Sequence, residues 1–215
     1  MSGLAGYLGY RVLGAFFGVL PEAAARRLGY AMGYASSYAS KRRLALARSH
    51  LRRVVGEDAD VDGAARRMFA SYGRYWAEVF WARPRRRQAI IDHAVVEGLD
   101  HVLAARDSPQ GVVFALPHVG NWEAAGAVAV DLGVPVLAVA EGLANKRLVD
   151  WFLGIRTALG IEVVLANESP TRRLVRRLKE GGTVALVCDR DILGSGVEVE
   201  FFGEKTRLPA GPANL

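Results

Sequence analysis

Cysteine and metal-binding clusters are scarce in this sequence. Cys188 is the only cysteine, so no disulfide can form within the chain and nothing indicates an oxidising compartment. The four histidines and the acidic residues show no metal-ligand spacing, and no glycine-rich phosphate loop appears. We therefore expect neither a metal ion nor a resident cofactor.

The sequence also lacks a hydrophobic run long enough for a comfortable membrane span. Residues 4–20 carry a single charge, Arg11, but a helix of this length measures only about 25 Å. Neither the charged start nor the small-residue cleavage site of a signal peptide is clear. We predict a helix that lies in the membrane interface or inserts marginally; a buried helix of the soluble fold is the alternative. Its aromatic residues suit the lipid headgroup zone: Tyr7, Tyr10, Phe16 and Phe17.

Negative charge is in deficit. The chain has 28 Lys and Arg against 22 Asp and Glu, and this net charge of +6 favours an anionic partner. The arginines cluster on predicted helices and the aromatic residues mostly accompany apolar runs, so we expect no nucleic acid as partner. Basic runs are usually solvated surfaces, but the run at 83–87 follows Trp76, Phe80 and Trp81 and can bind anionic lipid headgroups. We expect an anionic membrane surface as a partner.

The chain has two halves of different character. Residues 1–90 are rich in helix formers, and a helix predicted at 62–82 stops before Pro84, because the residue before a proline avoids the helical region. From residue 90 onward, short β-branched runs alternate with helical stretches, as in a sheet covered on both faces. The predicted strands are 111–117, 134–140, 161–166, 183–189 and 197–203, and the helices between them are 121–132, 144–158 and 170–180.

This alternation predicts an α/β fold with a mostly parallel sheet flanked by helices and a helical N-terminal region. The helix predicted at 170–180 has boundary signals, with Ser169 as N-cap and Gly181 after the last turn. We expect a single domain, with a helical membrane-associating part at 1–90 and an α/β core at 91–215. The last residues, "RLPAGPANL", do not complete an element, so we expect this core to be incomplete at its C-terminus.

Three polar residues lie at the ends of predicted strands: His118 and Glu141 directly follow a strand, and Asp189 is the last residue of one. Ligands of an open parallel sheet gather at the carboxyl ends of its strands. We therefore expect these three side chains to lie along one rim of the sheet.

His118 is the strongest candidate among them, in the segment "PHVGNWE" at 117–123. Asn121 can cap the helix that follows, which places Glu123 in its first turn. The backbone N–H groups of Gly120 and Asn121 can bind an anion or a developing oxyanion. A base, a carboxylate and oxyanion donors together suit acyl transfer. The alternative is ordinary turn chemistry, in which His118 bonds a loop carbonyl and Glu123 is a favourable acid at a helix start.

The segment "PHVGNWE" resembles the H-x(4)-D/E motif of the bacterial late lipid A acyltransferases. With "CDRD" (188–191), "GVEVEFFGE" (196–204) and "LPAGPANL" (208–215), the sequence most resembles the actinobacterial phosphatidylinositol mannoside acyltransferases, over most of its length. The resemblance implies transfer of a fatty acyl chain from acyl-CoA, as co-substrate, to a mannose hydroxyl of a membrane glycolipid acceptor. It also implies a location on the cytoplasmic face of the plasma membrane, peripheral or through an N-terminal anchor.

The resemblance implies that His118 is the general base and that a carboxylate orients its ring. Glu123 completes the motif, but Asp189 competes with it because Asp189 ends a strand of the same rim. Glu198 and Glu200, on the polar face of the last strand, are further candidates. An arginine at position 156 resembles a substrate or donor contact of the family; the alternative is a surface arginine. The residues that we expect to bind substrate are Asn121, Glu141, Arg156, Arg190, Glu198 and Glu200.

Other interpretations stay open at this point. A lipid A-type acyltransferase with an acyl carrier protein as donor needs the same base, and a membrane- or lipid-binding protein without catalysis needs none. A nucleophilic pair of Cys188 and His118 is less favoured, because Cys188 and Asp189 face opposite sides of a strand and a buried core thiol is expected. The sequence does not indicate an oligomeric state.

Overall fold

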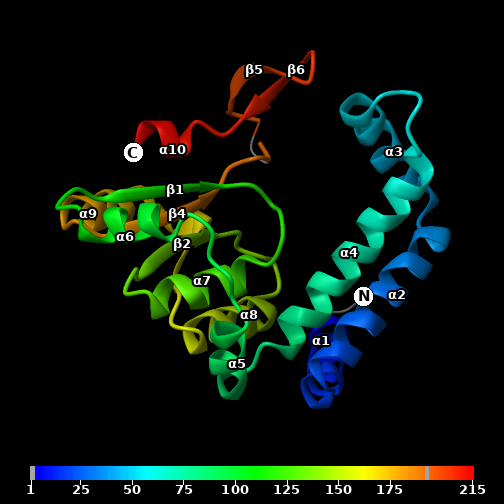
Figure 1. The fold of residues 1–215 in the computed structure, drawn as a ribbon, viewed down its shortest axis with the longest axis horizontal. Helices are drawn as coiled ribbons and strands as arrows, with labels where there is room; N and C mark the ends of the chain where they lie inside the picture. The colour runs from blue at the N-terminus through cyan, green and yellow to red at the C-terminus, as the bar shows by residue number, and fades with distance from the viewer. Residues whose placement is uncertain (1–2, 192–193) are drawn as a thin grey trace. The chain divides into compact units, whose positions relative to one another are not determined.

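The computed structural model describes residues 3–191 and 194–215, which form two compact units (Figure 1). The helical unit comprises residues 8–81 together with 201–204. The α/β unit comprises residues 82–200 and 205–215, together with the first helix up to Tyr7.

The helical unit is built from α1 (Gly3–Val19), α2 (Glu22–Ala39), α3 (Lys41–Val55) and α4 (Val61–Trp81). The helices predicted at 4–20 and 62–82 are confirmed to within one residue. The basic segment between them is divided into two helices at Ser40. Within the described ranges, no helix has both the length and the hydropathy that crossing a bilayer requires.

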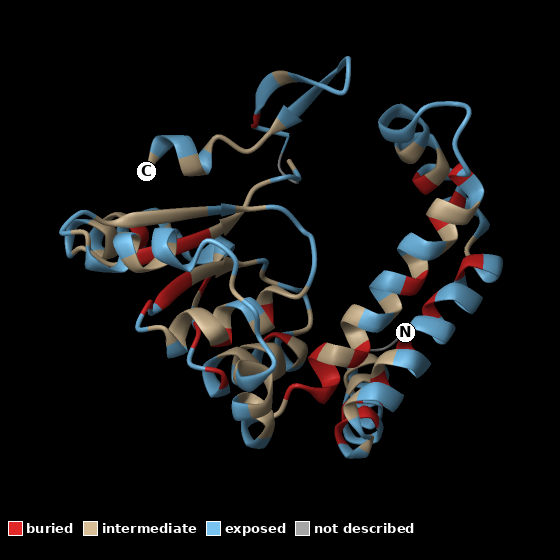
Figure 2. Cartoon of the chain, in the orientation of Figure 1, coloured by how far each residue is buried: buried red, intermediate tan, exposed pale blue. Residues whose placement is uncertain are grey.

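Small residues allow α2 and α4 to pack closely. A Cβ atom built at Gly33 would lie 2.9 Å from the Gly73 Cα atom and 3.0 Å from that of Ala70, closer than a side chain tolerates. Ala25 and Ala70 are fully buried, and Figure 2 shows further buried positions along both helices. The two backbones therefore approach each other as only glycine and alanine permit.

The α/β unit contains a four-stranded parallel sheet with the strand order β1-β4-β2-β3. Its strands are β1 (Val112–Leu116), β2 (Val136–Ala140), β3 (Glu162–Leu165) and β4 (Thr183–Val187). The connecting helices are α7 (Trp122–Asp131), α8 (Lys146–Ala158) and α9 (Thr171–Lys179). Shorter helices are Pro84–Arg86, α5 (Arg87–Asp92), α6 (Leu99–Asp107), Ala166–Glu168 and α10 (Gly211–Asn214).

Helices cover both faces of this sheet. Leu137 of β2 packs with Leu174 of α9, whereas the next residue, Ala138, packs with Ala127 of α7 and Ile155 of α8. Alternate residues of one strand thus face opposite layers, as the near-continuous apolar runs predict. The predicted α/β fold is confirmed.

The connections explain the strand order. Helices α7 and α8 lead outward from β1 to β2 and then to β3, on one face of the sheet. Helix α9 leads back from β3 to β4 and lies on the other face. Reversing both the direction and the face keeps all crossovers of the same hand, which parallel connections require. The return places β4 between β1 and β2.

Two details of the sequence prediction need correction. The strand predicted at 197–203 does not join the parallel sheet; β5 (Val197–Phe201) pairs with β6 (Glu204–Leu208) in a separate hairpin. The turn of this hairpin has positive φ at Phe202 (51°) and Gly203 (73°), as tight hairpin turns require.

The predicted N-cap of α9 was wrong as well. Ser169 has a left-handed φ of 53°, and the cap residue is Pro170. The Pro170 carbonyl accepts hydrogen bonds from the N–H groups of Arg173 and Leu174. Gly181, predicted to follow the helix, has a φ of 74° that suits glycine.

We expect Gly33→Ala and Gly9→Ala to change stability in opposite directions. At Gly33 the added methyl group meets the α4 backbone, and overpacking of this kind costs about 1–3 kcal/mol. At Gly9 nothing lies within 4 Å of a built Cβ atom, so alanine should stabilise α1 by about 0.5–1 kcal/mol. Urea unfolding followed by circular dichroism measures both, and equal effects would contradict the close packing of α2 and α4.

Candidate active site

The pairing of β1 with β4 brings together two residues that are 71 positions apart in sequence. Leu116 lies opposite Val187 at the carboxyl ends of these strands. The Cys188 N–H group donates to the Leu116 carbonyl at 2.9 Å and so continues the ladder beyond the strands. The same register, extended by two residues, places His118 opposite Asp189.

The Asp189 carboxylate holds His118 at two points. One oxygen, Oδ2, accepts a hydrogen bond from the His118 backbone N–H group at 2.9 Å. The other, Oδ1, lies 2.6 Å from the ring nitrogen Nδ1. Both side chains are about one-third exposed, at 33% and 37%, so the site is open to a ligand from solvent.

The hydrogen bonds fix the protonation pattern of this pair. Partial burial raises the pKa of the Asp189 carboxyl, but the hydrogen bonds from the His118 backbone and ring outweigh it and hold that pKa below its ordinary value of 3.8. At neutral pH Asp189 is therefore a carboxylate, which only accepts hydrogen bonds. In the neutral form of the His118 ring, the proton therefore sits on Nδ1 and Nε2 presents a lone pair, the arrangement of a general base.

The turn after β1 positions the ring at the start of α7. Gly120 has a φ of 69°, in the left-handed region that favours glycine. The Asn121 side chain then accepts a hydrogen bond from the Ala124 N–H group at 3.0 Å, which confirms the predicted cap. Trp122 contacts the His118 ring edge-on, with ring centroids 5.4 Å apart. We did not predict this contact, although the aromatic residue beside the cap was a visible signal.

Glu123 lies in the first turn of α7, as predicted, and the Arg156 guanidinium of α8 holds it. Its Oε1 atom accepts hydrogen bonds from Arg156 Nη2 at 3.0 Å and Nε at 3.3 Å. The Glu123 side chain is only 3% exposed and that of Arg156 is 21% exposed. A carboxylate buried to this extent needs such a partner, because an unpaired charge in the interior is costly.

The remaining candidates occupy three places. Glu141 is exposed and directly follows β2, the strand next to β4. Arg190 is exposed and directly follows Asp189. Glu198 and Glu200 are exposed on β5, and Glu198 pairs with Lys205 Nζ at 3.0 Å. The sequence left several carboxylates open as the partner of the His118 ring. In the structure, the partner is Asp189.

Cys188 does not form the alternative nucleophilic pair with His118. Its thiol donates to the Leu116 carbonyl at 3.6 Å, while the His118 ring bonds Asp189. The thiol is half-buried rather than fully buried as expected. In the part of the chain that the structure describes, no three His, Cys, Asp or Glu side chains gather as a metal site would require.

Two of the three aromatic residues beside the basic run are buried. Phe80 and Trp81 are 4% and 9% exposed within the helical unit. The Trp81 indole N–H donates to the Leu20 carbonyl at 3.1 Å. Of the basic run itself, Arg87 pairs with Asp131 at 3.4 Å.

The fold and the site together define an α/β protein with a carboxylate-oriented histidine at the carboxyl edge of a parallel sheet, a site able to activate a hydroxyl group. The sequence profile of the bacterial lipid A biosynthesis acyltransferases matches residues 4–215, nearly the whole chain. The chain belongs to this family.

Three individual proteins are similar to this chain over most of its length. A phosphatidylinositol mannoside acyltransferase of Mycolicibacterium smegmatis is 38% identical over 214 residues, which cover 97% of this chain and 69% of the relative. Proteins of the same name from two Mycobacterium tuberculosis strains are 41% and 40% identical over 78% of this chain. The chain spans 55% of the length of these two relatives.

The Glu123–Arg156 pair gives a prediction about stability. We expect Arg156→Met to lower the free energy of unfolding by about 3 kcal/mol, because it leaves the buried Glu123 carboxylate without its partner. Adding Glu123→Gln should recover part of this loss, because it removes the unpaired charge. Urea unfolding of the two single variants and the double variant measures the coupling, and strictly additive effects would contradict it.

Proposed function

We propose that the chain catalyses the transfer of a fatty acyl group from acyl-CoA to a mannose hydroxyl of a phosphatidylinositol mannoside. The observation that carries this proposal is the bond between Asp189 and the Nδ1 atom of His118, which leaves Nε2 as a base in a member of an acyltransferase family. The acceptor class is taken from the relatives, which are phosphatidylinositol mannoside acyltransferases. No resident cofactor is needed, because acyl-CoA is consumed as a substrate.

The proposed chemistry is a direct displacement. Nε2 of His118 takes the proton of the acceptor hydroxyl as its oxygen attacks the thioester carbonyl carbon. Asp189 keeps the ring in one orientation and stabilises the imidazolium that forms. The tetrahedral intermediate then collapses, the C–S bond breaks, and the departing thiolate of CoA takes the proton from His118. An ester and free CoA result, and no acyl-enzyme is formed.

The other candidate residues take supporting roles in this proposal. Glu123 and Arg156 position the start of α7, and with it the turn that carries His118. Partial positive charge at this helix start suits a developing oxyanion. We assign contacts with the two substrates to the half-buried Asn121 and to the exposed Glu141, Arg190, Glu198 and Glu200.

We expect His118→Ala to lower acyl transfer by about 10²- to 10⁴-fold, the usual contribution of a general base. Asp189→Asn should cause a loss of the same order, because an amide does not fix the required tautomer of His118. The assay follows labelled acyl-CoA into purified phosphatidylinositol mannoside by mass spectrometry. His101→Ala, an exposed histidine outside the site, is the matched control and should keep full activity.

Further arms of this assay separate the alternatives. Transfer from acyl carrier protein to a lipid A precursor, without transfer from acyl-CoA, would favour the related lipid A reaction. Unchanged lipids with every donor, from folded protein, would favour a lipid-binding protein without catalysis. Activity that survives His118→Ala would exclude His118 as the base.

The proposed location is the cytoplasmic face of the plasma membrane, and the start of α3 offers a suitable surface. Lys41, Arg42 and Arg43 are exposed, and no acidic side chain of the described residues pairs with them. Leu46 (60% exposed) and Tyr38 (60% exposed) lie near them in sequence. Basic side chains beside exposed apolar and aromatic ones are typical of a surface that binds anionic lipid headgroups.

Reversing these three charges tests the surface. We expect Lys41→Glu, Arg42→Glu and Arg43→Glu together to weaken binding to phosphatidylglycerol-containing vesicles by on the order of 100-fold, at about 1 kcal/mol for each basic residue. Vesicle sedimentation measures the affinity at several salt concentrations. Reversal of Arg172, Arg176 and Lys179 on α9 makes the same change in net charge and is the control; equal losses would show that only net charge matters.

A further inference from the structure

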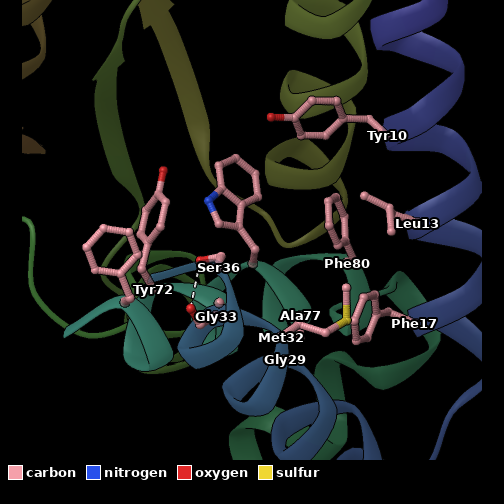
Figure 3. A pocket seen from close by; sticks show the side chains of 13 residues that line it. Tyr10, Leu13, Phe17, Gly29, Met32, Gly33, Ser36, Tyr72, Ala77 and Phe80 are labelled. Atoms are coloured by element: carbon pink, nitrogen blue, oxygen red, sulfur yellow. Dashed lines mark hydrogen bonds between the residues drawn. The ribbon is translucent and has the colours of Figure 1, made fainter. Parts of the chain in front are cut away.

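The helical unit contains a hollow that the proposed chemistry does not use (Figure 3). Its volume is about 280 Å³, and residues of α1, α2 and α4 line it. Leu13 and Phe17 project from α1 towards Phe80 of α4, and Met32 of α2 lies beside Phe17. The hollow lies entirely within the helical unit.

Aromatic rings form the wall of this hollow. Tyr72, Trp76 and Phe80 follow one another at four-residue intervals on α4, with ring centroids 6.0 Å and 5.8 Å apart. From α1, Tyr10 meets Trp76 at 5.7 Å, and Phe17 stacks on Phe80 at 6.0 Å. Rigid rings held on two helices give the hollow an apolar wall that does not collapse easily.

The floor of the hollow is fixed by the close contact of α2 with α4. Gly29, Gly33 and Gly73 line it, and a Cβ atom at Gly29 would lie 2.8 Å from the Gly73 carbonyl oxygen. The Ser36 hydroxyl donates to the Gly33 carbonyl at 2.7 Å, so its hydrogen is already used within α2. None of the thirteen described lining residues carries a charge.

The rim of the hollow is exposed and apolar. Leu13, Met32 and Tyr72 are lining residues that are 38%, 48% and 58% exposed. The outer face of α1 continues this apolar surface, and Arg11 is the only charged residue of the helix. The exposed apolar residues of that face are Leu8 (51%), Val12 (67%), Phe16 (47%) and Val19 (73%). An apolar surface of this extent marks a contact with a partner or a membrane.

We infer that this hollow holds one acyl chain of a bilayer lipid. A chain can pass from a bilayer onto the outer face of α1 and into the hollow without crossing water. The volume of about 280 Å³ accommodates part of one acyl chain, and the uncharged, mostly apolar lining suits a hydrocarbon chain rather than a charged headgroup. The polyanionic CoA group would need cations, and the lining offers none. The inference rests on the membrane location proposed above, but not on acyl transfer.

The test uses lysophosphatidylcholine with a photoreactive diazirine on its single chain, at concentrations below its micelle formation. Because this probe is monomeric, its binding to the hollow can be measured even if the protein does not bind vesicles. After irradiation, mass spectrometry identifies the labelled peptides. We expect label on the lining segments of α1, α2 and α4, and the same label in His118→Ala.

Two neighbouring substitutions on α1 give a matched pair. Leu13→Trp fills the hollow and should lower labelling of the lining by at least about tenfold, equivalent to about 1.4 kcal/mol of binding free energy. Val12→Trp places the same side chain on the outer face and should leave the labelling unchanged. Circular dichroism checks folding, and Met32→Trp fills the hollow from α2 if Leu13→Trp does not fold.

Four results would overturn the inference. Labelling that is unaffected by both Leu13→Trp and Met32→Trp would exclude the hollow as the chain site, and so would equal losses in Leu13→Trp and Val12→Trp. Stronger labelling of the lining by acyl-CoA with the same photoreactive chain would assign the hollow to the donor. A dimer in sedimentation that Leu13→Trp abolishes would show that a second copy of the chain covers it.

Discussion

The candidate site depends on the two hydrogen bonds that the Asp189 carboxylate accepts from His118, one from its backbone N–H group and one from its ring. It requires β4 to lie directly beside β1, because only adjacent parallel strands place residues at the same level of one rim. That adjacency in turn requires α9 to return across the opposite face of the sheet from α7 and α8. The buried Leu174 of α9, packed with Leu137, therefore helps to hold the strand order that the site requires. A site of two residues depends on the topology of the whole α/β unit.

The two acids of the site divide their roles according to burial. Glu123, in the motif, is almost fully buried and ion-paired with Arg156, so it stabilises the start of α7. Asp189 is one-third exposed and bonded to His118, so it acts where a substrate has access. A buried ion pair is weak support for stability in itself but leaves a large penalty when one partner is removed. In the proposed reaction, Glu123 would therefore support the position of His118 without bonding its ring.

The sequence predicted what depends on local pattern and missed what depends on distant contacts. Strand-end position was sufficient to place His118 just after β1 and Asn121 as the cap of α7, whereas the role of His118 as a base stays a prediction. The choice of Asp189 was open, because strand order is set by packing between elements and not by the residues near either end. Strand β6 was missed because "EKTRL" lacks the apolar alternation of a half-buried strand. The burial of Trp81 was missed because one sequence cannot show which face of an aromatic-rich helix is covered.

The helical unit has two kinds of apolar surface: a closely packed contact between α2 and α4, and an open space beside it. Close contact of glycine and alanine residues brings α2 and α4 together, but small residues leave no side chains to fill the space beside the contact. Large aromatic residues of α1 and α4 surround that space without closing it, and Leu13 and Met32 remain partly exposed at its edge. A protein that faces only water gains by covering such a surface, since exposed apolar area is costly. At the proposed membrane location a bilayer would remove that cost, because lipid chains would solvate the outer face of α1 and fill the hollow, and the exposed basic residues Lys41–Arg43 would attract anionic headgroups.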